Sequence, residues 1–471
     1  MSNSFVQVHP NEYGFDFTHG DQVLPQPRSA ELVAFGRYFV NDLRITKAFS
    51  RRLDPLLADW IDTALFVYLA DRLSLRRRHA SQHYALQWGR KLHLKVPVRR
   101  PEVWTRLEIY ESLQRLLHFF TEDDWQIEFV KGCKTQRLSE SQNPLLPAWE
   151  PSPVRVALYS GGLDSFAGTV QQIAELPEHQ FVLVSGVTST RQGKAQQNQI
   201  KAINKAAART AIHIPVFYRL RHGIERAEEL SQRSRGFLFM TLGVVTAITA
   251  GVNELYIYEN GIGAINLPYD GSQIGTSNTR SVNPIALLRM SKFVADLTGA
   301  PFRIENPFLF QTKAEMCRHP EVRRLGDHIS LTFSCDHFPI RRKDQPQCGV
   351  CTSCMLRRLS LESAGLHSFD SGYLRDLLSG QFLGGRKQLN SLWVMDWQAQ
   401  RIAAAVASSE PWKALRQEFP ALIDVVSEVC KTKGSRPEEI QSALLRLYSQ
   451  YINEWNSFSA RKLLTKQALA A

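Results

Sequence analysis

The chain has 471 residues, 44% of them hydrophobic, with a formal net charge of +12 and a pI of about 9.4. This length and apolar content are enough for two or three domains with buried cores, and they argue against a disordered or fibrous protein. The positive charge permits contact with nucleotides, nucleic acid or another acidic partner, although it says nothing about the fold.

The beginning of the chain, MSNSFVQVHPNEYG, has no charged start followed by an apolar core, so the sequence predicts no secretory signal and a cytoplasmic protein. In such a reducing compartment, cysteines that cluster bind metal more often than they form disulfides. One uncharged stretch, Gly236–Asn253, reaches the length of a membrane span. Because it contains threonines and glycines and runs into the strand-like LYIY, we interpret it as a buried helix and expect no membrane contact.

Residues 1–150 are predicted to form an α+β accessory domain. Apolar spacing indicates helices at 54–73 and 103–120 and strands at 86–98 and 125–130. Four prolines between Ser139 and Pro153 exclude a helix there and mark the first domain boundary.

The segment 151–365 changes to short apolar runs separated by helical stretches. The runs VRVALY, FVLVSG, IPVFY and LYIY predict strands of a parallel sheet that helices cover on both faces, which is a doubly wound α/β domain. Ligands of such sheets bind beyond the carboxyl ends of the strands. Residues 366–471 return to helical periodicity, near Trp397–Ala407 and Pro437–Trp455, and are predicted to form a helical C-terminal extension.

The first of these strands runs directly into Ser160-Gly161-Gly162-Leu163-Asp164-Ser165 and then into a helical stretch. A strand, a Ser-Gly-Gly turn and a helix N-terminus bring several backbone N–H groups around one point, where the helix dipole adds partial positive charge. The glycines let the backbone approach an anion, and the hydroxyls of both serines can donate further hydrogen bonds. Asp164 either holds Mg²⁺ or caps the helix. The alternative is a plain capped Gly-Gly turn. The loop lacks a Gly-Lys-Ser/Thr ending, which disfavours ordinary γ-phosphate hydrolysis.

Four cysteines, Cys335, Cys348, Cys351 and Cys354, follow the pattern C-x12-C-x2-C-x2-C. Thiolates at this spacing can surround one tetrahedral Zn²⁺ in a closed structural site, although an iron–sulfur cluster suits the same ligands. Zinc is the preferred prediction. Three further cysteines, Cys133, Cys317 and Cys430, have no such spacing and are expected to be ordinary thiols.

The segment SGGLDS resembles the signature of PP-loop ATP pyrophosphatases, which have an adenine nucleotide alpha hydrolase-like fold. The resemblance implies cleavage of ATP between the α- and β-phosphates and transfer of AMP to a carbonyl or carboxylate oxygen. Together with the late cysteines it resembles the QueC-like 7-cyano-7-deazaguanine synthases of queuosine biosynthesis, in order over residues 154–365. The segments RGFLF, from Arg235, and NPFLFQTKAE, Asn306–Glu315, are similar to blocks of that family.

On this resemblance Lys313 reaches the ATP phosphates and Arg235 lines the nucleotide or substrate pocket. Without it, both would be interpreted as helix-surface or helix-terminal residues. Glu259 and Asn260 follow the strand LYIY at the ligand edge, where the carboxylate could pair with a guanine-like base. Thr279 and Arg280 close the following loop, and Arg280 could hold the carboxylate that is activated. The alternatives are a turn cap for Glu259 and a surface ion pair for Arg280.

The chain also departs from dedicated queuosine enzymes, because they have roughly half its length and a different substrate loop. The stretch from Glu259 through Asn-Leu-Pro to Thr-Arg resembles divergent relatives in bacterial anti-phage systems, namely the Qat type and the type IV form of cyclic-oligonucleotide defence (CBASS). That resemblance implies a different outcome, in which the activated deazaguanine is joined to an amine of a partner protein from the same operon.

The sequence therefore predicts a ligase that uses ATP, Mg²⁺ and a structural Zn²⁺ to adenylate 7-carboxy-7-deazaguanine and pass it to an amine, preferentially of a partner protein in anti-phage defence. The alternatives are nitrile synthesis with ammonia, as in queuosine-type biosynthesis, and a PP-loop enzyme that modifies tRNA. Nucleic acid is not favoured as the partner, because sulfur insertion needs a cysteine near the loop and the clustered four are committed to metal. A scaffold that binds nucleotide without turnover is a further alternative.

Overall fold

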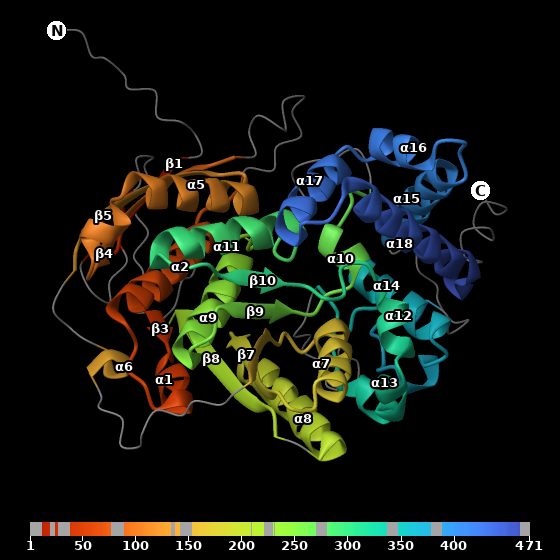
Figure 1. The fold of residues 1–471 in the computed structure, drawn as a ribbon, viewed down its shortest axis with the longest axis horizontal. Helices are drawn as coiled ribbons and strands as arrows, with labels where there is room; N and C mark the ends of the chain where they lie inside the picture. The colour runs from red at the N-terminus through yellow and green to blue at the C-terminus, as the bar shows by residue number, and fades with distance from the viewer. Residues whose placement is uncertain are drawn as a thin grey trace, which may run out of the picture.

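The structure is a computed structural model that describes residues 12–18, 24–26, 38–76, 89–132, 137–141, 153–208, 210–220, 229, 231–269, 280–336, 347–377 and 389–461. Figure 1 shows a sheet at the centre of the molecule, a smaller sheet to the upper left and a group of helices to the right.

The central sheet has six strands in the order β10-β9-β6-β7-β8-β3. Its members are β3 (Tyr38–Val40), β6 (Val154–Leu158), β7 (Gln180–Val187), β8 (Ile212–Leu220), β9 (Glu254–Ile257) and β10 (Arg303–Glu305). Neighbouring strands are parallel except β3, which pairs antiparallel with β8. The four runs predicted as strands are β6, β7, β8 and β9, so the predicted parallel sheet is confirmed.

Helices cover both faces of this sheet. In β6, Val156 and Leu158 belong to one hydrophobic core, whereas Ala157 belongs to another on the opposite face. The first face is covered by α1 (Leu43–Phe49), α2 (Pro55–Leu73), α9 (Arg235–Ala250) and α11 (Pro284–Thr298). The second is covered by α7 (Leu163–Glu175), α8 (Thr190–Ala207), α12 (Lys313–Arg318) and α13 (Pro320–Arg324). Burial on both sides explains why these strands are continuous apolar runs. The arrangement is consistent with the PP-loop fold.

The segment before residue 150 shares a core with the central sheet. Strand β3 pairs with β8, and the rings of Tyr68 in α2 and Tyr218 in β8 meet edge to face at 5.6 Å. Trp60 of α2 contacts Phe293 of α11 in the same way, at 5.5 Å. A domain boundary near residue 150 stays a prediction, since one hydrophobic core crosses it.

A second, four-stranded sheet lies beside this core, in the order β2-β1-β4-β5. Its strands are β1 (Glu12–Asp16), β2 (Leu24–Gln26), β4 (Lys91–Val98) and β5 (Asp124–Lys131), and its helices are α4 (Pro101–Trp104) and α5 (Leu107–Thr121). The short helix α6 (Leu138–Ser141) lies beside α1 (Figure 1). The helix predicted over 103–120 is divided, because Arg106 has an extended backbone between α4 and α5.

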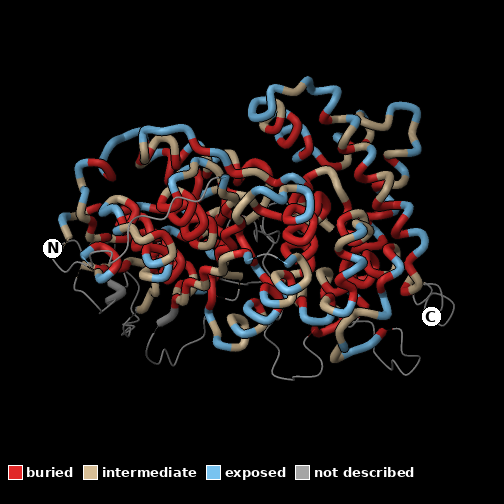
Figure 2. The backbone as a smooth tube through the Cα atoms, turned by 60° about the horizontal axis from the view of Figure 1, so that its bottom comes forward, coloured by how far each residue is buried: buried red, intermediate tan, exposed pale blue. Residues whose placement is uncertain are grey.

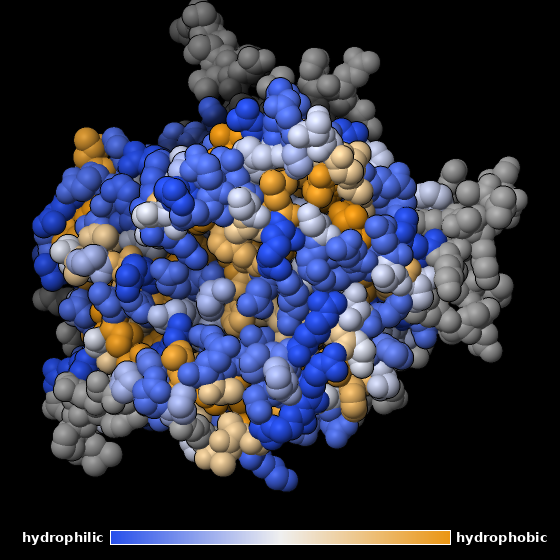
Figure 3. Space-filling view, turned by 45° about the vertical axis from the view of Figure 1, so that its right-hand side comes forward, coloured by the Kyte–Doolittle hydropathy of each residue, from blue (hydrophilic) through white to orange (hydrophobic). Residues whose placement is uncertain are grey.

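The C-terminal helices form a third core, which they share with the four cysteines and with α10 (Gly261–Ile265). They are α14 (Thr352–Ser363), α15 (Asn390–Val406), α16 (Pro411–Glu418), α17 (Ala421–Lys433) and α18 (Pro437–Ser457). Figure 2 shows buried segments throughout the interior of the molecule and exposed segments mostly at its periphery. The face in Figure 3 is largely hydrophilic, with small apolar patches between charged side chains.

The uncharged stretch in the middle of the chain forms α9, most of which is buried against α2 and the sheet. Its interpretation as a buried helix is therefore confirmed. Within the described ranges, no helix combines the length and the hydropathy required to cross a membrane.

Candidate active site

The Ser-Gly-Gly turn lies where β6 ends, at the carboxyl edge of the central sheet. Gly162 is the N-cap of α7 and has no side chain with which to cap it. Gly161 has a φ of +86°, and a Cβ on it would lie 2.6 Å from Cζ of Phe333. The left-handed backbone and the ring above it both require glycine at this position.

Two serine hydroxyls organise the backbone of this turn. The N–H of Gly161 donates to Oγ of Ser165 at 3.1 Å, and the N–H of Gly162 donates to Oγ of Ser160 at 3.2 Å. Oγ of Ser165 also donates to the carbonyl oxygen of Gly162, at 3.0 Å. The loop amides are thus held together at the positive end of the α7 dipole, an arrangement that can bind an anion.

A segment that sequence reasoning missed packs against this turn. The N–H of Phe333 donates to the carbonyl oxygen of Gly161 at 3.2 Å, and the N–H of Leu163 donates to Oγ of Ser334 at 3.5 Å. The next residue is Cys335. The only signal in the sequence was this proximity to the first cysteine, and it did not indicate a contact with the turn.

Asp164, the second residue of α7, lies in a buried acid–lysine cluster. Nζ of Lys313 is 2.7 Å from Oδ2 of Asp164. Nδ2 of Asn260 donates to Oδ1 of Asp164 at 3.1 Å and to Oε1 of Glu259 at 3.0 Å. Four residues from three distant parts of the sequence therefore meet around one point. We call Asp164, Glu259, Asn260 and Lys313 the acid–lysine cluster.

The cluster contains more negative than positive charge. Loss of water around Glu259 and the nearby Asp164 carboxylate raise the pKa of Glu259 well above its ordinary value, and Lys313 opposes this only in part. Burial disfavours the ammonium of Lys313, but Asp164 and Glu259 outweigh that effect and raise its pKa. Lys313 is therefore charged, and one of the two carboxyl groups retains a proton to higher pH than usual.

Strand order explains why these residues meet. β6 and β9 are neighbours, and the chain proceeds from β6 towards β7 on one side while β9 and β10 lie on the other. Such a switch point leaves a crevice at the carboxyl ends of the strands. Asp164 follows β6, and Glu259 follows β9.

Asn306, which follows β10, fixes the backbone of Glu259. Its Nδ2 donates to the carbonyl oxygen of Glu259 at 2.8 Å, and its Oδ1 accepts from the N–H of Phe308 at 3.1 Å. The sequence block that includes Asn306 was noted for its resemblance, but this supporting role was not predicted.

Arg235 is exposed at the first position of α9 and makes no hydrogen bond or ion pair with Asp164 or Lys313 among the described residues. The residue before it is tied to the N-terminal segment. Ser234 donates to Oδ2 of Asp71 from its N–H at 2.8 Å and from its Oγ at 2.7 Å. The predicted pocket role of Arg235 stays a prediction.

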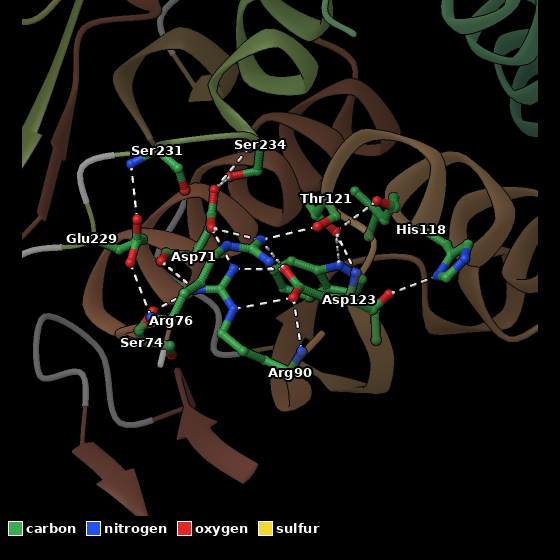
Figure 4. Close-up of polar contacts among 12 residues, drawn as sticks. Asp71, Ser74, Arg76, Arg90, His118, Thr121, Asp123, Glu229, Ser231 and Ser234 are labelled. Carbon is green, nitrogen blue, oxygen red and sulfur yellow. Dashed lines mark hydrogen bonds and ion pairs between the residues drawn. The ribbon is translucent and has the colours of Figure 1, made fainter. Parts of the chain in front are cut away.

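Asp71 belongs to a buried ion network that Figure 4 shows between α2, β4 and the start of β5. Nη2 of Arg90 lies 2.5 Å from Oδ1 of Asp71 and 2.6 Å from Oδ2 of Asp123. Nη2 of Arg76 is also 2.6 Å from Oδ2 of Asp123. All four side chains are fully buried, so this network anchors the beginning of α9 to the N-terminal segment.

Arg280 lies against the end of α5. Its Nη1 donates to the carbonyl oxygen of Phe119 at 3.1 Å, and its Nη2 pairs with Oε1 of Glu122 at 2.7 Å. This is the ion pair that the sequence offered as the alternative, and a role in holding a substrate carboxylate stays a prediction. Thr279, the other residue predicted for this loop, lies outside the described residues.

The four-cysteine cluster is assembled as its spacing predicts. The sulfurs of Cys335, Cys348, Cys351 and Cys354 lie within 4.8 Å of one another, and all four residues are buried. A tetrahedral zinc ion with Zn–S bonds of about 2.3 Å requires sulfurs about 3.8 Å apart. The Sγ atoms of Cys348 and Cys354 are 3.8 Å apart. The described cysteines form no disulfide, and Cys133 lies outside the described residues.

Backbone N–H groups point at these sulfurs. The N–H of Val350 and that of Cys351 donate to Sγ of Cys348 at 3.4 Å and 3.3 Å. Gly349, between Cys348 and Val350, has a φ of +78°, and a Cβ there would lie 2.0 Å from the carbonyl oxygen of Arg375. Such donors stabilise thiolate charge, which fits the residues to a metal ion.

Comparisons with known proteins agree with this site. Residues 234–365 match the family model described as "Queuosine biosynthesis protein QueC". The chain is similar to 7-cyano-7-deazaguanine synthases of Novosphingobium aromaticivorans (26% identity; 46% of this chain, 93% of that protein) and Ralstonia nicotianae (26%; 45% and 95%). The corresponding protein of Nitrosococcus oceani is 30% identical over 28% of this chain and 54% of its own length.

These similarities support an enzyme of the PP-loop type with a QueC-like region, at low identity. The family model covers a little over a quarter of the chain and contains Glu259, Asn260, Lys313 and the four cysteines, but the Ser-Gly-Gly turn lies before it. The anti-phage subtype that the sequence suggested is not shown by these relatives, all of which have the nitrile synthase name.

Proposed function

We propose that this chain uses ATP to activate the carboxylate of 7-carboxy-7-deazaguanine and converts the acid to the nitrile with ammonia. The observation that carries the proposal is the buried pairing of Lys313 with Asp164, directly after the Ser-Gly-Gly turn and at the switch point of the sheet. The names of the similar proteins supply the substrate class.

The proposed reaction begins at the α-phosphorus of ATP. A carboxylate oxygen forms a bond to this phosphorus, the bond to the bridging oxygen breaks, and pyrophosphate leaves with the electron pair. Ammonia then attacks the acyl carbon, AMP leaves, and loss of a proton gives the amide. The amide oxygen then forms a bond to the α-phosphorus of a second ATP and pyrophosphate leaves. The C–O bond breaks as AMP leaves with that oxygen, and loss of two protons from nitrogen gives the nitrile.

Several groups of the chain can stabilise the negative charge that develops on the leaving pyrophosphate. The N-terminus of α7 offsets the charge on the departing pyrophosphate, and Lys313 contributes a full positive charge. The hydroxyls of Ser160 and Ser165 accept the glycine N–H groups of the turn and hold its backbone in place. A cluster fixed before the reaction needs no reorganisation when that charge develops. Burial of Lys313 strengthens its interaction with an anion.

The surplus negative charge of the acid–lysine cluster fits Mg²⁺. Carboxylate oxygens are the ligands that this ion prefers, and Asp164 and Glu259 would hold it beside the turn. The ion would neutralise phosphate charge when bound. This assignment differs from the base-recognition role predicted for Glu259, and it is favoured because Glu259 lies beside Asp164 and Lys313.

The test is incubation of the chain with ATP, 7-carboxy-7-deazaguanine and ammonium, with pyrophosphate, AMP and product mass as readouts. We expect pyrophosphate and AMP in equal amounts and a product with the mass of the nitrile. Release of phosphate in place of pyrophosphate, or no release under any condition, would contradict the proposal.

A second candidate is transfer of the activated acid to an amine of a partner protein, as the Qat and type IV CBASS resemblance implies. It is favoured by one observation: more than half of this chain lies outside the region aligned with the first two relatives. Adding proteins encoded by adjacent genes separates the two candidates. A mass increase on a partner would support conjugation, whereas free nitrile alone would exclude it.

For the four-cysteine cluster we propose one structural zinc ion, because four thiolates leave no position open for a reactant. Metal analysis of the purified chain should find about one zinc per chain. The Cys351→Ser variant should lose the metal, whereas Cys430→Ser, outside the cluster, should retain it. If the analysis instead finds iron, together with visible absorbance, the site holds an iron–sulfur cluster and the zinc assignment is wrong.

A further inference from the structure

The C-terminal helix α18 contacts the turn of α12 that carries Lys313. α12 begins at Lys313, and its N-cap is Thr312. Oγ of Thr312 accepts the N–H of Glu315 at 3.1 Å, and the carboxylate of Glu315 accepts the N–H of Thr312 at 2.8 Å. This capping box fixes the direction in which the helix starts, and with it the position of Lys313.

Each residue of the capping box is bound by α18. The hydroxyl of Thr312 donates to Oε1 of Glu454 at 2.8 Å. Nη1 of Arg446 pairs with Oε1 of Glu315 at 2.6 Å, and its other terminal nitrogen bonds the carbonyl oxygen of Phe310. The carboxylate of Glu315 therefore caps α12 through Oε2 and contacts Arg446 of α18 through both oxygens.

These side chains form one stripe on α18. Arg446, Gln450 and Glu454 are four residues apart, so they lie on the same face of the helix. Nε2 of Gln450 donates to Oε1 of Glu454 at 2.9 Å and holds that carboxylate in place. Glu454 is buried, and burial raises its pKa despite its hydrogen bonds. A buried carboxylate of this kind is a poor source of stability, which points to a positional role.

The same helix contacts the other side of the cluster. A Cβ on Gly261 would lie 2.6 Å from Cδ2 of Leu447 and 2.0 Å from the carbonyl oxygen of Leu309. Gly261 follows Asn260 and donates its N–H to the carbonyl oxygen of Gln311 at 2.8 Å. α18 therefore packs against two of the three segments that deliver the acid–lysine cluster, although it lies outside the QueC-like region.

We propose that α18 is a part of the catalytic apparatus, in which Glu454 and Arg446 are positioning residues that fix Lys313 for an anionic ligand. The proposal rests on the proposed function for its kinetic readout, but not for its structural one. Displacement of a charged group by about 1 Å can reduce a rate by up to 10²-fold without removing any group that touches the substrate.

The test compares two matched pairs of substitutions on α18. Glu454→Gln and Arg446→Met change the contacts with α12, whereas Glu439→Gln and Arg436→Met change an exposed ion pair in the first turn of the same helix. Arg446→Lys keeps the charge but loses the two-pronged contact. Each variant is first compared with the parent chain by thermal unfolding.

The first readout is hydrogen exchange of the amides of α12, which requires no turnover. We expect faster exchange in Glu454→Gln and Arg446→Met, a smaller change in Arg446→Lys and none in the two controls. Binding of inorganic pyrophosphate alone should weaken about tenfold in the first two variants. Unchanged exchange and unchanged pyrophosphate affinity would overturn the proposal.

The second readout is pyrophosphate release with ATP and the deazaguanine acid. We expect kcat to fall about tenfold in Glu454→Gln while KM for the acid stays constant, because Lys313 acts on the departing group. Equal loss in the controls would show a general effect of α18 on folding and would overturn the positioning role. If the parent chain releases no pyrophosphate, the proposed function fails, and the exchange and affinity measurements still decide this proposal.

Discussion

The N-terminal ion network and the acid–lysine cluster are both buried groups of ionised side chains, but their charges are balanced differently. In the network, Arg76 and Arg90 face Asp71 and Asp123. Burial would raise the pKa of Asp71, yet the two arginines outweigh it and lower that pKa. In the cluster, one lysine faces two carboxyl groups, and the pKa of Glu259 is raised.

This difference separates a structural group from a candidate functional one. A balanced network satisfies its own charges and has no capacity for another ion. A cluster with surplus negative charge retains a proton or accepts a cation, and surplus of this kind is typical of sites that bind a ligand or perform acid–base chemistry. Burial separates the two groups less clearly than charge does, because Asp164, Asn260 and Lys313 of the cluster are buried as well.

The largest effect is expected from a substitution that disrupts the balanced network. Arg90→Met removes the guanidinium between two buried aspartates and should lower the free energy of unfolding by about 3–5 kcal/mol. Urea denaturation measures it. Arg115→Met, which changes an exposed i,i+4 pair with Glu111, is the matched control and should change stability by less than about 0.5 kcal/mol. Equal effects of the two variants would contradict the structural role of the network.

In contrast to Arg90→Met, Lys313→Met should affect activity more than stability. Loss of its charge should reduce kcat of pyrophosphate release by about 10²–10³-fold, the usual effect of removing one preorganised donor. The fold should survive, since one carboxyl group of the cluster already tends to hold a proton. Lys292→Met, at an exposed pair with Asp296, is the control for kinetics. Full activity of Lys313→Met would remove the basis of the proposed function.

The pH dependence of stability should differ in sign between the two regions. Glu259 has a folded pKa above its unfolded value of about 4.5, so its contribution to stability falls as pH rises from there to the folded pKa. Asp71 has a lowered pKa, so its contribution is present above about pH 3.8 and is lost as pH falls further.

Glu259→Gln tests the first half of this contrast. In the absence of divalent cations, the stability of the variant should not fall as pH rises towards the folded pKa of Glu259. Its stability relative to the parent chain should therefore increase by about 1.4 kcal/mol per pH unit between the unfolded and the folded pKa of Glu259. Denaturation at a series of pH values from weakly acidic to neutral measures it. Parallel curves for the two proteins would contradict the surplus of negative charge.

The smallest effect is expected at Arg280, which pairs with Glu122, the residue before Asp123 of the network. Both side chains are partly exposed, so Arg280→Met should cost no more than about 1 kcal/mol of stability. If Arg280 also holds the substrate carboxylate, as predicted from the sequence, Arg280→Met should in addition raise the KM for the deazaguanine acid. An unchanged KM would leave Arg280 with only its contact at the end of α5.

The sequence by itself determined the parts whose signal is local. Four apolar runs predicted strands of the parallel sheet, and the spacing of four cysteines predicted a group of sulfurs that now lie within 4.8 Å of one another. The turn at Gly161 was identified because a Ser-Gly-Gly segment stands between a predicted strand and a helical stretch. These features depend on neighbouring residues or on fixed spacing, so no knowledge of the fold was required.

Only the tertiary structure decided which distant residues act together. Lys313 and Asp164 are far apart in the chain and meet because β10, which precedes Lys313, and β6, which precedes Asp164, lie on the two sides of β9 in the sheet. The sequence did not predict three further features: the division of the helix at Arg106, the contact of Phe333 with the turn, and the support of α12 by Glu454. Such contacts depend on the three-dimensional packing of separate elements, and the periodicity of each element says which face is apolar but not which partner covers it.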